Sequence, residues 1–151
     1  MPGAPGRYLA LDVGDKRIGV ALSDETATLA SPLTTLTRGG VRKDTAAAVE
    51  LARHHGVVAV VVGLPLNMDG SRGPQAEKVL AFVEALRRRL PVPVLPRDER
   101  LTTVEAEGRL REAGLDWRER KRVIDQTAAV VILQEYLDQR ASVPAASGGQ
   151  G

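Results

Sequence analysis

The sequence predicts an α/β fold with a mixed five-stranded sheet, in which three antiparallel strands precede two parallel ones and helices cover both faces. Three observations predict this fold. Short apolar runs follow one another between residues 8 and 37 with only brief connections. A continuous β-branched run at residues 57–62 is typical of a strand buried on both faces of a parallel sheet. Helical segments then alternate with a further short strand, as in a sheet with helices on its faces.

The first part of the chain is predicted to form an antiparallel meander. Tyr8 to Val13, Arg17 to Ser23 and roughly Ala30 to Thr37 read as strands, and their connections contain Gly and Asp. A helix is then expected from Asp44 to His55. Gly56 is expected to end this helix, because glycine readily adopts the left-handed conformation found after many helices.

The later elements alternate between strand and helix. The strand at residues 57–62 is followed by a helix that opens at Pro74 and runs to about Leu90, and then by a short strand at residues 92–97. Thr102 and Glu105 form a capping box for a helix that ends near Gly114. A last helix is expected from about Trp117 to Gln139.

Length and composition narrow the class of protein. A chain of 151 residues is expected to form one domain, with its core at about residues 7–139 and disordered ends at 1–6 and 140–151. No apolar run approaches the roughly 20 residues of a membrane span, and the first residues do not have the pattern of a signal peptide. The absence of cysteine fits a reducing compartment, so a cytoplasmic location is expected.

Acidic residues interrupt the hydrophobic pattern in three separate elements. Asp12 ends the first apolar strand, and the acids Asp98 and Glu99 follow the short strand that ends near Arg97. Asp125 shares one face of the last helix with Ala129 and other apolar residues at helical spacing. Burying a carboxylate costs several kcal/mol unless something positive compensates it. The pattern therefore predicts one shared site at the edge where the central strands end.

Other polar segments have less specific interpretations. The loop at residues 63–73 follows the central strand, and its Asn67 and Ser71 are candidate phosphate donors as readily as ordinary turn residues. His54 and His55 are explained by the dipole at a helix end. The basic run Arg118 to Arg122 leads directly to Asp125, and such a run beside carboxylates suits a polyanionic ligand.

The motifs resemble those of the YqgF/RuvX family. The matching segments are, in chain order, Leu11 to Gly14, Arg17 to Ala21, Gly63 to Pro65, Asp98 to Thr103 and Ile124 to Ala129. The resemblance spans about Tyr8 to Leu137 and implies a ribonuclease H-like fold and a nuclease. Members of the family are assigned to processing of the 5′ end of pre-16S ribosomal RNA, and earlier to Holliday junction resolution.

Carried over to this chain, the resemblance places the catalytic and metal-binding acids at Asp12, Glu99 and Asp125. Asp98 stays open as a fourth ligand, although strand alternation points it away from Glu99. Phosphodiester hydrolysis suits two Mg²⁺ or Mn²⁺ ions, with Asp12 bridging them and the other two acids each holding one. The expected substrate-binding residues are Lys16, Arg17, Asn67, Arg100, Arg118, Lys121 and Arg122.

The resemblance leaves the substrate and the oligomeric state open. RNA is the first expectation and DNA the alternative, acted on by a monomer or a homodimer. A junction resolvase should work as a symmetric dimer that cuts two strands. Two other hypotheses remain: an ATPase of the actin-like or sugar-kinase class, for which a duplicated second half is missing here, and a ribosome-assembly module that binds nucleic acid without cutting it.

Overall fold

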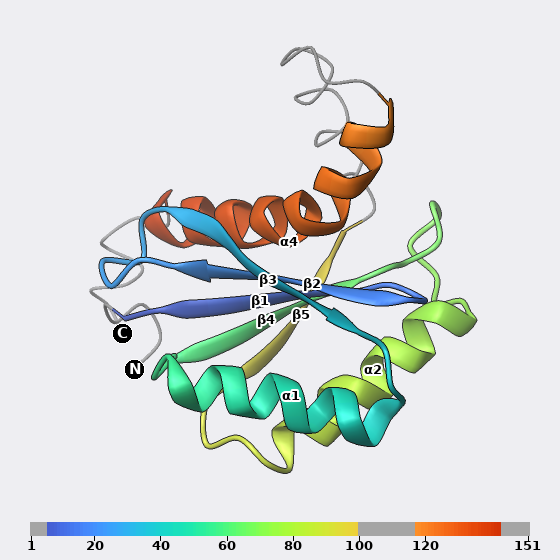
Figure 1. The fold of residues 1–151 in the computed structure, drawn as a ribbon, viewed down its shortest axis with the longest axis horizontal. Coiled ribbons are helices and arrows are strands. Elements are labelled where there is room, and N and C mark those ends of the chain that lie inside the picture. The colour runs from blue at the N-terminus through green and yellow to red at the C-terminus, as the bar shows by residue number, and fades with distance from the viewer. Residues whose placement is uncertain (1–5, 100–116, 143–151) are drawn as a thin grey trace.

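The computed structural model describes residues 6–99 and 117–142, and within the last helix it describes the side chains of residues 128–140. Its centre is a five-stranded sheet in the order β3-β2-β1-β4-β5 (Figure 1). The strands are β1 Tyr8–Val13, β2 Arg17–Ser23, β3 Ala30–Thr37, β4 Ala59–Leu64 and β5 Val94–Asp98. β1 pairs antiparallel with β2 and parallel with β4, so the predicted mixed sheet is confirmed.

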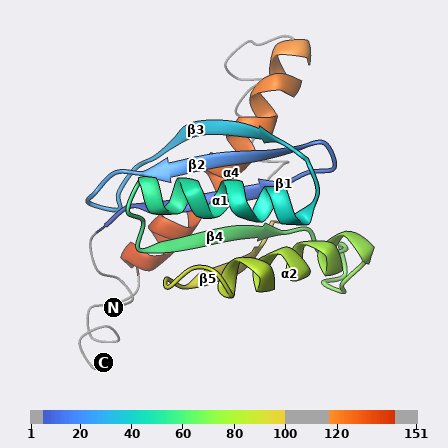
Figure 2. The ribbon, with the colours of Figure 1, turned by 60° about the horizontal axis from the view of Figure 1, so that its bottom comes forward.

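Helices cover both faces of the sheet, as predicted. Helices α1 (Val41–His54) and α2 (Pro74–Arg87) lie on one face, and α4 (Trp117–Ser142) crosses the other (Figures 1 and 2). Each face has its own hydrophobic core. Leu9 and Leu11 of β1 belong to the core with α1 and α2, whereas Tyr8 and Ala10 belong to the core with α4.

Alternation along β1 determines which face the site occupies. Because successive side chains of a strand point to opposite faces, Asp12 shares the α4 face with Tyr8 and Ala10. Along β4, Ala59 and Val61 belong to the same core. The acidic residue that interrupts the apolar pattern thus lies at the end of the strand, on the face that α4 covers.

The element boundaries differ from the prediction by a few residues. α1 begins at Val41, three residues before Asp44, because the Asp44 carboxylate accepts a hydrogen bond from the Gly39 N–H (2.9 Å) rather than capping a helix that starts at Asp44. β4 and β5 begin two residues later than expected, α2 ends at Arg87 and α4 continues to Ser142. Gly56, with a φ of 60°, follows α1 as predicted.

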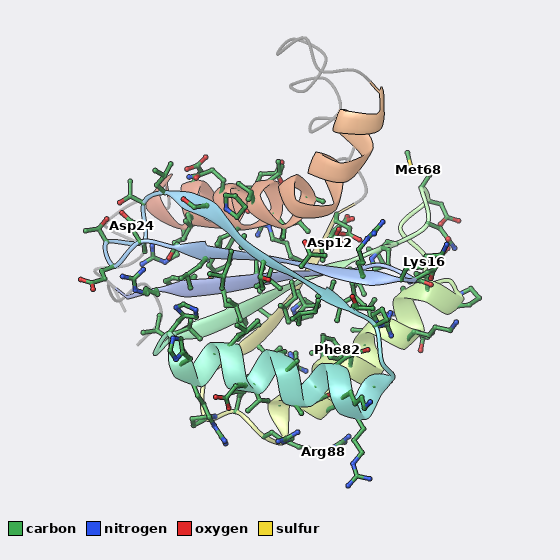
Figure 3. All side chains as sticks on the ribbon, viewed as in Figure 1. Asp12, Lys16, Asp24, Met68, Phe82 and Arg88 are labelled. Atoms are coloured by element: carbon green, nitrogen blue, oxygen red, sulfur yellow. The ribbon has the colours of Figure 1, made fainter. Side chains whose placement is uncertain are left out.

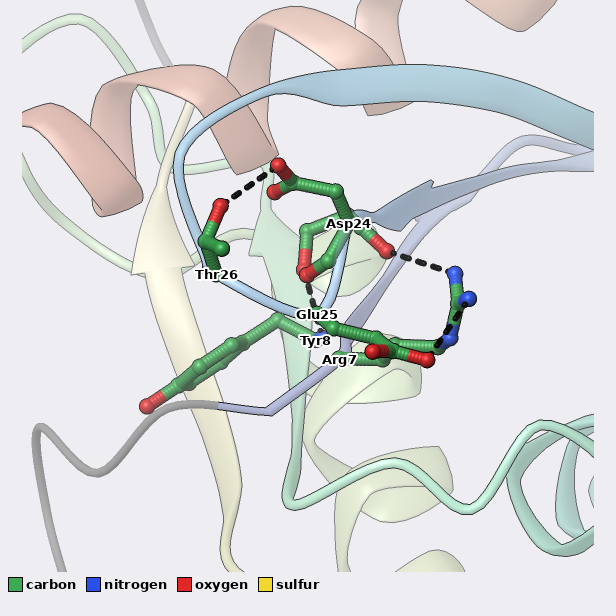
Figure 4. A network of polar contacts seen from close by, with 6 residues as sticks. Arg7, Tyr8, Asp24, Glu25 and Thr26 are labelled. Atoms are coloured by element: carbon green, nitrogen blue, oxygen red, sulfur yellow. Dashed lines mark hydrogen bonds and ion pairs between the residues drawn. The ribbon is translucent and has the colours of Figure 1, made fainter.

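A polar network holds the strands at the end of the sheet opposite Asp12 (Figures 3 and 4). The backbone N–H of Tyr8 donates to Ser23 Oγ at 2.8 Å, joining the start of β1 to the end of β2. Thr26 Oγ1 donates to Asp24 Oδ2 at 2.6 Å within the following turn. The site lies at the other end of β1, where backbone pairing with β2 continues to Val13.

Some predictions lie outside the described residues. They are the capping box at Thr102, the helix that ends near Gly114, and most of the ends predicted to be disordered, 1–6 and 140–151; of these ends, residue 6 is described and residues 140–142 are helical, as part of α4. Within the described residues, no helix has the length and apolarity needed to cross a membrane.

Candidate active site

Asp12 lies between two glycines on the neighbouring strands. In β2 its register partner is Gly19, and in β4 the pairing of Leu11 with Val62 places Gly63 one residue further along. Neither glycine carries a side chain, so other groups have room to approach the carboxylate from both sides. The sequence analysis did not single out Gly63.

Glu99 reaches the same place from the neighbouring strand. β5 runs parallel to β4 with Leu64 opposite Asp98, and the Glu99 N–H donates to the Leu64 carbonyl oxygen at 3.2 Å. The Glu99 carboxylate lies over Gly63: a Cβ added there would overlap Glu99 Oε2 and lie 2.6 Å from Ile132 Cδ1. A glycine at this position is therefore what allows the acid to pass over the strand.

The two carboxyl groups are hydrogen-bonded to each other, and one of them holds a proton. Burial raises the pKa of Glu99 to about 9, helped by the negative charge of Asp12, by the hydrogen bond to Asp12 and by the charge of Asp98. Two acids this close cannot both ionise without a counter-charge. The pair consequently behaves as a single proton-sharing unit near neutral pH.

This pair predicts an unusual pH dependence of stability in metal-free protein. In the folded chain the pKa of Glu99 is about 9, against an ordinary value of 4.5. The proton on Glu99 therefore stabilises the folded state fully below pH 4.5, and this stabilisation is lost as the pH rises through about 9. We expect the melting temperature in chelator to fall from about pH 5 to about pH 9. Glu99→Gln cannot ionise and should show a shallower fall. Equal slopes for the two proteins would contradict the shared proton.

Gly63→Ala tests the packing at the crossing point. The added methyl group would collide with the Glu99 carboxylate and with Ile132, so either the strands or the acid must move. Overpacking of this kind costs about 1–3 kcal/mol. The matched control is Gly39→Ala, an exposed position where the added Cβ would meet only the flexible Lys43 side chain, at 3.1 Å. Urea unfolding of the two variants should show a clear loss for Gly63→Ala alone.

The donor chemistry of the pair fits a divalent cation. Carboxylate oxygens are the hard ligands that Mg²⁺ and Mn²⁺ prefer, and a cation can replace the proton that the two acids share. Within the described residues no group of three His, Cys, Asp or Glu side chains comes together. The third predicted acid, Asp125, has its backbone in α4, and its side chain lies outside the described residues.

The direction of α4 determines where Asp125 enters the fold. The Tyr136 ring lies 5.6 Å from the Tyr8 ring at the start of β1, while Ile132 approaches Gly63 near the end of β4. α4 therefore runs opposite to β1, and its earlier residues lie toward the edge where the strands end. Asp125 precedes Ile132 by two turns of the helix.

Two of the predicted basic substrate contacts, Lys16 and Arg17, have described side chains. Lys16 is exposed in the hairpin after β1, at the same end of the molecule as Asp12 (Figure 3), and Arg17 is exposed at the start of β2. Arg100 and the side chains of Arg118, Lys121 and Arg122 lie outside the described residues. The structure thus brings Asp12 and Glu99 together and places Lys16 nearby.

Asn67 belongs to a loop whose side chains form hydrogen bonds with one another. Its Nδ2 donates to Ser71 Oγ at 2.9 Å, and Ser71 Oγ donates in turn to Asp69 Oδ1 at 2.6 Å. The loop is exposed and its tip, Met68, lies at the same end of the molecule as Asp12 (Figure 3). The predicted phosphate donor is therefore already engaged in shaping the loop that carries it.

The sequence analysis missed a partly buried ion pair that holds the hairpin after Asp12. Arg38 Nη1 donates to the Gly14 carbonyl oxygen at 2.6 Å, and Arg38 Nε donates to Asp44 Oδ2 at 2.7 Å. The Arg38 N–H also donates to the Lys16 carbonyl oxygen at 2.9 Å. An arginine in a loop and an aspartate near a helix start have ordinary local explanations, so the sequence contained no clear signal of this contact.

Comparison with known proteins shows the family. The sequence model of RuvX, described as Holliday junction resolvase, matches residues 6–139. The chain belongs to the RuvX family. RuvX-family relatives named "Putative pre-16S rRNA nuclease" include one from Caldanaerobacter subterraneus, 52% identical over 89% of this chain and 97% of its own length. Another, from Chloroflexus aurantiacus, is 53% identical over 90% and 89%.

Solved structures confirm the fold of this RuvX-family chain. Thermus thermophilus RuvC in complex with a Holliday junction substrate matches with a TM-score of 0.56 at 16% identity, over 91% of this chain and 96% of that one. The fowlpox virus Holliday junction resolvase matches with a TM-score of 0.51 at 13% identity, over 88% and 99%. The predicted ribonuclease H-like fold is therefore correct, and the family assigns the chain to the nucleases that hydrolyse phosphodiester bonds.

Proposed function

We propose that this chain is a metal-dependent nuclease that processes the 5′ end of pre-16S ribosomal RNA. The observation that carries the proposal is the partly buried Asp12–Glu99 pair, which shares a proton at the strand edge where a cation would replace it. The names of relatives about half identical over nearly the whole chain support the choice of RNA. A cytoplasmic location and a single domain belong to the same proposal.

The proposed metal ligands are Asp12, Glu99 and Asp125. When two Mg²⁺ or Mn²⁺ ions are bound, they supply a nucleophilic water and neutralise charge on the leaving oxygen. Asp12 has a glycine on each neighbouring strand, which would leave room for cations beside its carboxylate. Glu99 would give up its proton to bind a cation, and α4 would supply Asp125 as the third ligand.

The chain's own cations bind and orient the polynucleotide. Lys16 is exposed in the hairpin beyond Asp12, where it can meet the phosphate backbone without neutralising the acids. The remaining proposed substrate contacts are Arg17, Asn67, Arg100, Arg118, Lys121 and Arg122. Arg38 and Asp44 bind no substrate in this proposal, but they hold the hairpin that presents Lys16.

A comparison of substrates tests the proposal. Purified protein is incubated with a precursor fragment that spans the 5′ end of 16S rRNA, with an unrelated single-stranded RNA and with a four-way DNA junction, each with Mg²⁺, Mn²⁺ or chelator. We expect cleavage of the precursor at the mature 5′ end, with either ion and not with chelator. Cleavage that persists in chelator would refute the metal requirement, and equal cutting of both RNAs would refute the assigned substrate.

Junction resolution is the second candidate function, favoured by the description of the matching family model. It predicts paired, symmetric nicks in the four-way junction and a dimer in solution. Faster cutting of the junction than of the ribosomal precursor, with a dimer by light scattering, would put this candidate first. Failure to cut any of the substrates with either ion would instead favour a binding module for ribosome assembly.

A further inference from the structure

Two arginines and two tyrosines form a continuous row between the sheet and α4. The guanidinium carbon of Arg97 lies 5.7 Å from the centre of the Tyr136 ring, and that ring lies 5.6 Å from the Tyr8 ring at an angle of 46°. The guanidinium carbon of Arg140 lies 5.2 Å from the centre of the Tyr8 ring. We call these four residues the Arg–Tyr row.

The row begins beside the acidic pair. Arg97 lies in β5 two residues before Glu99, so the two side chains share the α4 face of the strand and are separated by about 6.6 Å of backbone. β5 is the last strand of the sheet, and its outer edge has no neighbouring strand among the described residues. A polynucleotide that meets Asp12 and Glu99 can therefore continue along this edge and reach Arg97.

Each cation of the row lies over an aromatic ring. Within the described residues, no carboxylate oxygen lies within 4.0 Å of either guanidinium. The Arg97 guanidinium lies over the Tyr136 ring, a cation–π contact that restricts where it can move. Tyr136 is only partly buried, so the row borders solvent at this point. A fixed guanidinium at a solvent border suits a phosphate.

We propose that the Arg–Tyr row is a binding track for the phosphate backbone that flanks the cleaved bond. Arg97 contacts the nearest flanking phosphate, and Arg140 contacts a phosphate further along. Tyr136 is a positioning residue that holds Arg97 in place. This inference rests on the proposed nuclease function because it needs a polynucleotide at Asp12 and Glu99. The track contacts phosphates and not bases, so RNA binding to it should not depend on base sequence.

Direct binding tests the track without requiring cleavage. A fluorescently labelled single-stranded RNA is titrated with protein in chelator, at salt concentrations from about 0.05 M to about 0.3 M. Arg97→Gln should weaken binding severalfold and reduce the slope of log Kd against log salt by about 0.7, the value for one phosphate contact on a single strand. Arg97→Lys should restore the slope, because lysine also binds phosphate as a point charge.

The matched control is Arg88→Gln. Arg88 is exposed at the end of α2, on the far side of the sheet from α4 (Figure 3), and its loss changes the net charge by the same amount. We expect its salt slope to equal that of the wild type. Equal slopes for Arg97→Gln and Arg88→Gln would overturn the inference, and so would a wild type that binds no RNA.

Variants of Tyr136 distinguish the positioning of Arg97 from the effect of its charge. Tyr136→Leu leaves both guanidinium groups in the chain, so we expect weaker binding with an unchanged salt slope, while Tyr136→Phe should bind as the wild type does. Tyr136→Leu binding like the wild type would overturn its positioning role. If wild type binds RNA with an Arg97-dependent slope but cuts no precursor, the track stands and the proposed function fails. Normal cutting with a slope independent of Arg97 would refute the track and leave the proposed function standing.

Discussion

Asp12→Asn should abolish cleavage while leaving the fold intact. The amide keeps the size of the side chain but loses the negative charge that would hold a cation. Loss of a single charge-stabilising group in an active site costs about 10²–10³-fold in kcat, and a bridging ligand should cost at least as much. The measurement is the single-turnover cleavage rate of the ribosomal precursor in Mg²⁺. Removing the Asp12 charge also relieves Glu99, so metal-free stability at high pH should not fall.

Asp15→Asn is the matched control for this variant. Asp15 is exposed in the hairpin that follows β1, only three residues beyond Asp12, and it undergoes the same chemical change. We expect it to cleave at close to the wild-type rate. If Asp12→Asn also cut the precursor normally, the assigned active site would be wrong.

Among substitutions that break one ion pair of the described residues, Asp44→Ala should cause the largest loss of stability. The Asp44 side chain is 3% exposed and its partner Arg38 is 27% exposed, so the substitution leaves a largely buried guanidinium without its counter-charge. It also removes the acceptor of the Gly39 N–H. Breaking a buried pair by removing one partner costs about 3–5 kcal/mol, and the partial exposure of Arg38 favours the lower end. Urea unfolding measures the change.

Glu77→Ala is the corresponding control at the surface. Glu77 pairs with Arg72 at 3.9 Å, and the two side chains are 61% and 63% exposed. Exposed pairs contribute about 0–1 kcal/mol, so this variant should unfold near the wild-type urea midpoint. A similar loss for the two variants would show that Asp44 has no special structural role. Asp44→Ala should in addition weaken RNA binding, because the hairpin that presents Lys16 loses its clamp.

Much of the fold could be predicted because local pattern and tertiary structure agree. The strands β1, β2 and β3 have the predicted bounds, since their apolar runs are closed by Gly, Asp or Thr. The position of Asp12 near Glu99 also followed from pattern, because the C-terminal ends of parallel strands meet at one edge. Asp125 stays a prediction, as its side chain is outside the described residues.

The features that could not be predicted depend on contacts between distant segments. The crossing of Glu99 over Gly63 needs the register of β4 and β5, which no local pattern supplies. The helix α1 starts at Val41 because the Asp44 carboxylate accepts hydrogen bonds from Arg38 and Gly39, which precede the helix. From the sequence alone, an aspartate at this place is expected to be the N-cap residue. The sequence predicted only that Arg97 ends a short strand. Its contact with the Tyr136 ring depends on how α4 packs on the sheet.

The most direct test of the proposed site counts the protons released when Mn²⁺ binds. Calorimetric titrations near pH 7, in two buffers of different ionisation enthalpy, give the number of protons set free per ion bound. Because Glu99 holds a proton with a pKa of about 9, we expect wild type to release about one proton and Glu99→Gln to release none. Asp12→Asn should bind Mn²⁺ far more weakly. Binding without proton release, or binding of Mn²⁺ that is unchanged in Asp12→Asn, would contradict a cation site built on this pair.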